Sequence, residues 1–88
     1  MTVEAAGSTI NSIWLIVARE QDRKLTPDER EQLERLCEIL RQGIPERPIY
    51  NRAARDLCAL LTSPGFIETE AGMEEAVNKI KGLWHMTG

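Results

Sequence analysis

The sequence has little of what catalysis and metal binding usually require. It contains a single histidine, His85, and two cysteines, Cys37 and Cys58, which is too few for a typical four-ligand zinc site. No glycine-rich loop has the spacing of a phosphate-binding motif, and no serine lies in the pattern of a nucleophile elbow. We therefore expect a non-enzymatic protein with no catalytic residues, no bound metal and no cofactor.

Long apolar runs are also missing. The longest spans residues 13–18, whereas a membrane-spanning helix needs about 20 residues. The run also lacks the basic flank of a secretory signal. We expect a cytoplasmic protein that does not enter a membrane. Cys37 and Cys58 fall on the apolar sides of predicted helices, so we expect reduced, buried thiols; a disulfide between neighbouring helices is the alternative.

Size and charge limit the function classes further. The chain has 88 residues, enough for one domain, with 42% apolar and 28% charged residues, an ordinary globular balance. Its 11 basic and 14 acidic side chains give a net charge of −3, which argues against broad, nonspecific binding to nucleic acid. A core this small would gain stability from a partner subunit.

The clearest structural signal is the start of a helix at Thr26. Thr26 fits the N-cap, Pro27 the first helical position, and Glu29 the position from which a carboxylate reaches back to the cap amide. Apolar residues then recur at helical spacing, and Gly43 is placed to end the helix. The residues in this stripe are Leu33, Leu36, Cys37, Leu40 and Ile44. The sequence predicts a helix over about 27–42.

Three further helices are predicted. We expect residues 1–7 to form a flexible N-terminal arm, followed by a single helical domain over 8–86. Its first helix is capped by Ser8 or Thr9 and runs to about Lys24, although a buried strand over 13–17 is the competing interpretation. A proline-rich bend over 44–47 separates helix 27–42 from a helix over 48–62. A last helix starts at Thr69 or Glu70.

The fold class is all-α, a compact bundle or orthogonal array of about four short helices. Each of the other helices has one apolar stripe, and Phe66 and Ile67 are expected to fill the core from a loop. The stripes are Ile10, Ile13, Trp14 and Val17; Ala53, Ala54, Leu57, Cys58, Leu60 and Leu61; and Met73, Ala76, Val77, Ile80, Leu83 and Trp84.

Arginines gather around the start of helix 48–62. Arg47, Arg52 and Arg55 flank Tyr50, and guanidinium groups near a helix N-terminus suit phosphate or carboxylate ligands. Tyr50 would offer a ring face on which a base could stack. We interpret this arginine edge as an anion-facing surface. The alternative is that the arginines pair with the protein's own acidic segment, residues 68–75, or lie in water.

Excess apolar surface indicates self-association or a partner. Leu15 and Ile16 lie opposite the core stripe of their helix, which predicts a contact with a second copy of the chain. Trp14 and Trp84 fit the core, but tryptophan is also enriched at interface hot spots. Trp84 is therefore a candidate for a subunit or partner contact.

Three functional hypotheses follow. The first is a protein-interaction module, an adaptor or inhibitor that occupies a partner's surface. Its size and lack of catalytic motifs are shared by phage and mobile-element accessory proteins that block host machinery, an analogy of character and not of residues. The second is a nucleic-acid or nucleotide binder that uses the arginine edge. The third is an enzyme subunit that contributes helices to a shared site. No motif assigns the chain to a family.

Overall fold

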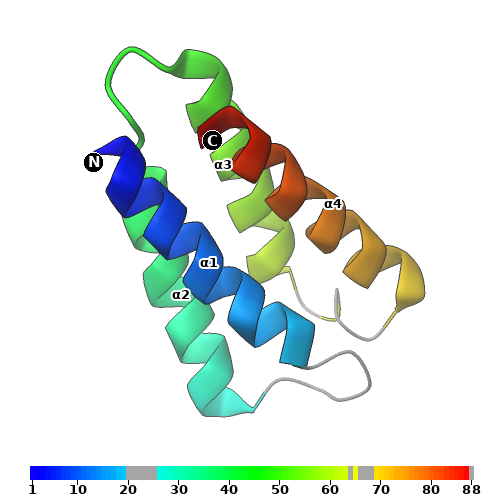
Figure 1. The fold of residues 1–88 in the computed structure, drawn as a ribbon. Helices are drawn as coiled ribbons and strands as arrows, with labels where there is room; N and C mark the ends of the chain where they lie inside the picture. The colour runs from blue at the N-terminus through cyan, green and yellow to red at the C-terminus, as the bar shows by residue number, and fades with distance from the viewer. Residues whose placement is uncertain (20–25, 64, 66–68, 88) are drawn as a thin grey trace.

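The computed structural model describes residues 1–19, 26–63, 65 and 69–87. This part of the chain is helical, with α1 over Val3–Arg19, α2 over Pro27–Arg41, α3 over Pro48–Thr62 and α4 over Glu70–Thr87, and no strands (Figure 1). The all-α prediction is confirmed. The competing strand over 13–17 is wrong, because these residues lie in α1.

The helices form a ring in which each packs against two neighbours. Helix α1 contacts α2 and α4, and α3 contacts the same two helices from the opposite corner. Consecutive helices run in opposite directions, and both chain ends lie at the end of the bundle that carries the α2–α3 connection (Figure 1). Of the two predicted architectures, this arrangement is the compact bundle, with helices that run alternately up and down.

The core is one cluster with contributions from all four helices, and it follows the predicted stripes. Its buried apolar residues are Ala6, Ile10, Ile13, Val17, Leu33, Cys37, Leu40, Ile44, Tyr50, Ala54, Leu57, Cys58, Leu61, Ala76, Ile80 and Leu83. Half-buried residues pack around it, among them Trp14, Leu36, Leu60 and Trp84. The periodicity therefore placed each described helix with the correct face inward.

The start of α2 has the predicted capping box. The Glu29 amide donates to Thr26 Oγ1 at 3.2 Å, and the Thr26 amide donates to Glu29 Oε1 at 3.1 Å. Asp28 and Glu29 supply negative charge to the first turn, which the helix dipole favours. On the outer face, Arg35 and Glu31 pair at 2.8 Å. Thr26 thus provides acceptors for the Glu29 and Arg30 amides at the start of the helix.

The predicted arm over residues 1–7 is wrong, because α1 begins at Val3 instead of Ser8 or Thr9. Thr2 Oγ1 accepts from the Ala5 amide at 3.1 Å, and Ala6 is fully buried. The N-terminal ammonium donates to the Gly43 carbonyl at 2.7 Å, so the N-terminus is attached to the α2–α3 connection. The apolar periodicity of this segment was too weak to predict its helical turn, which is stabilised by the contact with Gly43 and by the burial of Ala6.

Two expectations lie outside the described residues: the extension of the first helix to Lys24, and the filling of the core by Phe66 and Ile67. At the start of α4, Thr69 Oγ1 accepts from the Gly72 amide at 3.0 Å, in agreement with Thr69 as the cap. None of the described helices is long and apolar enough to cross a bilayer.

Candidate interaction surface at the bend

The bend between α2 and α3 is held by the side chain of Asn51, which sequence reasoning missed. Asn51 Oδ1 accepts from the Ile44 amide at 2.7 Å, and Asn51 Nδ2 donates to the Ile44 carbonyl at 3.1 Å. Gly43 has φ 76°, the left-handed conformation that ends a helix. A Cβ on Gly43 would lie 2.9 Å from Asn51 Cγ. The bend therefore requires glycine for its backbone and for the approach of Asn51.

A second residue in the bend has an unusual backbone. Glu46 has φ 67°, a left-handed conformation that costs a residue with a side chain about 1–2 kcal/mol. The following amide, that of Arg47, donates to the Ile44 carbonyl at 3.2 Å. The two hydrogen bonds between Asn51 and Ile44 hold the backbone that precedes Glu46 in the same turn. The surrounding structure thus imposes this conformation and fixes the direction in which α3 starts.

The start of α3 lacks the features that complete α2. Arg47 occupies the N-cap position and makes no capping hydrogen bond with its side chain, and the first turn contains no acidic residue. Pro48 removes one of the free amides, but the amides of Ile49 and Tyr50 have no capping side chain. The positive end of this helix dipole therefore faces outward without a compensating charge from its own first turn.

Apolar surface is exposed at the same place. The side chain of Ile49 is 76% exposed, and that of Met86, at the end of α4, is 38% exposed. Together with their neighbours they line a surface hollow of about 300 Å³. Arg47 Nη1 donates to the Met86 carbonyl at 3.3 Å and joins the bend to α4. We call this hollow the bend surface; its residues are Glu46, Arg47, Pro48, Ile49, Tyr50 and Met86.

The arginine edge is exposed as expected, but only Arg47 lines the bend surface. Arg52 and Arg55 lie on the solvent side of α3. Neither forms an ion pair within the described part of the chain. The alternative, in which the arginines pair with the acidic segment over 68–75, is not observed among the described residues of that segment; Glu75 instead pairs with Lys79 at 3.9 Å.

The stacking role predicted for Tyr50 is wrong. Its side chain is only 3% exposed and belongs to the core, so no ring face is available to a nucleotide base. Its hydroxyl is buried without a hydrogen-bond partner, and burial raises the pKa of Tyr50 to about 12. The signal was present in the sequence, because Tyr50 precedes Ala54 and Leu57 at the i+4 and i+7 spacing of one buried stripe.

The other predicted contact residues lie elsewhere. Trp84 is half-buried, and its ring meets that of Trp14 edge to face, with centroids 5.3 Å apart, where α4 packs on α1. Leu15 is 51% exposed, in agreement with its predicted outward position. Ile16 packs against the core cluster instead. The two residues proposed for self-association therefore do not form one exposed patch, because Ile16 turns toward the core.

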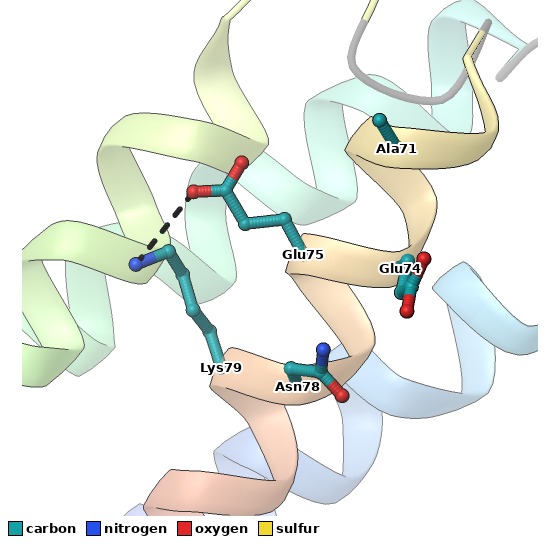
Figure 2. Close-up of a pocket in the computed structure, with 5 residues that line it drawn as sticks. All are labelled: Ala71, Glu74, Glu75, Asn78 and Lys79. Carbon is teal, nitrogen blue, oxygen red and sulfur yellow. Dashed lines mark ion pairs between the residues drawn. The ribbon is translucent and has the colours of Figure 1, made fainter.

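A second hollow lies on the outer face of α4 (Figure 2). Its volume is about 450 Å³, and its lining residues are Ala71, Glu74, Glu75, Asn78 and Lys79. All of them come from one helix, and Figure 2 shows their side chains spread along its outer side without a facing wall. The single ion pair there, between Glu75 and Lys79, is a helix-surface pair of small energetic value. This hollow is a solvated helix face.

The two cysteines are free and buried, as expected. The Cys58 thiol donates to the Cys37 carbonyl at 3.5 Å. A hydrogen bond with Cys58 and burial raise the pKa of the Cys37 thiol above its ordinary value, so this group stays protonated near neutral pH. Among the described residues, no cluster of three or more metal-ligating side chains occurs.

Comparison with known proteins yields no match to a protein family, to a curated protein or to a solved structure. The bend surface is where a left-handed backbone, exposed apolar side chains and the uncapped start of α3 coincide. It carries one basic side chain, that of Arg47, and one acidic side chain, that of Glu46.

Proposed function

We propose that this protein is a small, non-catalytic interaction module, an adaptor or inhibitor that occupies the surface of a partner protein with its bend surface. The observation that carries the proposal is the exposure of Ile49, an isoleucine 76% open to solvent at a helix start. Isoleucine is among the residues most often buried in proteins. Met86 and Arg47 lie beside it, and methionine and arginine are enriched at interfaces.

The geometry of the bend supports recognition with little ordering on binding. The hydrogen bonds between Asn51 and Ile44 order the backbone of the bend that precedes Ile49. The hydrogen bond from Arg47 to the Met86 carbonyl joins this bend to the end of α4. A surface that is already ordered loses less conformational entropy when a partner docks. This favours a module that acts by occupation, the mode of accessory proteins such as those of phages and mobile elements. We place it in the cytoplasm.

Nucleic-acid binding remains the second candidate, supported by the exposure of Arg52 and Arg55. The burial of Tyr50 removes the stacking contact on which that hypothesis depended. Self-association through Leu15 is a further proposal, because that side chain is 51% exposed. The test below separates nucleic-acid binding from binding of a protein through the bend surface.

The test is affinity capture from cells that express the tagged protein, with a matched pair of variants. Ile49→Ala removes the exposed side chain at the bend, and Ile39→Ala removes another exposed isoleucine, 41% open, from α2. We expect Ile49→Ala to lose a captured protein that the parent and Ile39→Ala retain. If the captured material is nucleic acid and its binding weakens steeply with salt, the second candidate replaces this one.

A further inference from the structure

We propose that the bend surface recognises an acidic segment of the partner, with an apolar side chain packed against Ile49 and Met86 and an adjacent carboxylate paired with Arg47. This inference rests on the proposed function and specifies the chemistry of its partner. It is carried by the charge and apolar character found together at this end of the bundle.

The charge complementarity is local and one-sided. Between residues 41 and 55 the chain has four basic side chains, those of Arg41, Arg47, Arg52 and Arg55, and one acidic side chain, that of Glu46. The molecule as a whole is acidic, with a net charge of −3. The uncapped start of α3 adds the positive end of a helix dipole to the same place. Of these side chains, those of Arg47 and Glu46 line the hollow. The net charge of the stretch over 41–55 is positive, so it attracts an acidic segment.

Arg47 retains the capacity to bind a carboxylate. It uses Nη1 for the Met86 carbonyl, at 3.3 Å, and a guanidinium has five N–H donors in a planar fork. The contact with Met86 restricts the side chain, so less entropy is lost when a carboxylate pairs with the remaining donors. Ile49 and Met86 lie next to this group in the wall of the hollow. The apolar and charged contacts can therefore be made by neighbouring residues of one segment.

The apolar part of the surface favours a protein segment over a nucleic acid. A phosphate backbone would be drawn to Arg47, Arg52 and Arg55, but it offers no apolar group to cover Ile49. Base stacking, which often binds single strands, has no platform here because Tyr50 is buried. A partner with both carboxylates and apolar side chains can pair with Arg47 and cover Ile49 and Met86.

The experiment titrates the isotope-labelled protein with short synthetic peptides and follows its amide resonances. The first probe has glutamates flanking paired leucines; the second replaces the leucines by alanine; the third replaces the glutamates by lysine. We expect saturable shifts at Ile49, Tyr50 and Met86 with the first probe. We expect affinity at least about tenfold weaker with the second, as for loss of an anchor residue, and no binding with the third.

Protein variants assign the contacts. Arg47→Gln is paired with Arg30→Gln, an exposed arginine of α2, and Ile49→Ala with Ile39→Ala. We expect weaker binding of the first probe by Arg47→Gln and Ile49→Ala alone, with unchanged spectra elsewhere as proof of folding. Equal binding of the glutamate and lysine probes at Ile49 would overturn the acidic inference and leave the proposed function standing. The acidic inference would also be overturned if the first probe showed no saturable binding, or if it shifted only resonances of other surfaces.

Discussion

The starts of α2 and α3 resemble each other in sequence but differ in how they are capped. Both have proline at the first helical position. Thr26 and Glu29 close a capping box at α2, whereas Arg47 at α3 makes no capping hydrogen bond. The first turn of α2 contains carboxylates, and that of α3 contains an isoleucine that is 76% exposed.

The difference shows which helix start is capped by a side chain of this protein: that of α2, and not that of α3. At the start of α2, Thr26 Oγ1 accepts from the Glu29 amide and Glu29 Oε1 accepts from the Thr26 amide, as a capping box requires. The start of α3 departs from this capping pattern, and its position is fixed by Asn51 and by the core instead. Local rules that a folded protein breaks tend to mark functional sites. The comparison therefore singles out the bend surface.

The largest expected effect is the loss of stability when a buried leucine is truncated, and it tests whether α2 and α3 pack equally well against the core. Leu33 of α2 is 1% exposed and Leu57 of α3 is fully buried, so Leu33→Ala and Leu57→Ala should each cost about 2–5 kcal/mol in urea unfolding. Leu36 is only half-buried, so Leu36→Ala should cost less. A small cost at Leu57 with a full cost at Leu33 would mean that α3 is loosely attached throughout, and the contrast would not be confined to its first turn.

The next largest effect is expected at Asn51, whose side chain forms two hydrogen bonds with the backbone of the bend. Asn51→Ala removes two hydrogen bonds and leaves the Ile44 amide and carbonyl without these partners. We expect a loss of about 1–3 kcal/mol in the free energy of unfolding. Hydrogen exchange of the Ile44 amide should speed up more than that of amides in the middle of α2. An unchanged exchange rate would show that the bend does not depend on Asn51.

The two cap positions give the direct contrast in stability. Thr26→Ala should cost about 1 kcal/mol, because the cap oxygen satisfies a helix amide. Arg47→Ala should change the free energy of unfolding by less than about 0.5 kcal/mol, as for an exposed side chain. Both values come from urea midpoints at unchanged slope. Equal losses at the two positions would remove the claim that only α2 is completed by its cap.

The smallest effect concerns the buried hydroxyl of Tyr50. Burial raises its pKa from 10.0 to about 12, so the folded state holds the proton more tightly than the unfolded chain. The contribution to stability is intact below pH 10 and is lost as pH rises toward 12. We expect Tyr50→Phe to unfold at an unchanged or slightly higher urea midpoint at pH 7, since the hydroxyl has no partner. Its stability should also fall less steeply above pH 10 than that of the parent. Parallel pH curves would argue against a buried hydroxyl.

The sequence was sufficient for the elements whose signals are local. The capping box at Thr26, the stop at Gly43 and the limits of α3 between Pro48 and Thr62 follow from short-range chemistry. The start of α1 was missed for two reasons. Its local signal, Thr2 as the acceptor for the Ala5 amide, lies in a segment of weak apolar periodicity. Its N-terminal end also contacts Gly43, far along the chain. Such long-range contacts leave no pattern in a neighbouring window of sequence.

The candidate site was predicted in part for the same reason. Arg47 was identified from the clustering of arginines, and the structure places it in the bend surface. Ile49 and Met86 were missed, because a sequence does not show which apolar residues the core leaves exposed. Asn51 was missed because its side chain acts on Ile44, seven residues earlier. Tyr50 was assigned to the surface although its helical spacing to Ala54 indicated the core.

The most direct test of the account is site-specific photocrosslinking in cells that express the protein. A photoreactive amino acid replaces Ile49 of α3 in one variant and Ile39 of α2 in the other, and both isoleucines are exposed. Before irradiation, both variants should show the circular dichroism and urea midpoint of the parent. We expect a covalent adduct with another protein from position 49 and none from position 39. Adducts from position 39 alone, or equal adducts from both, would contradict the assignment of recognition to the start of α3.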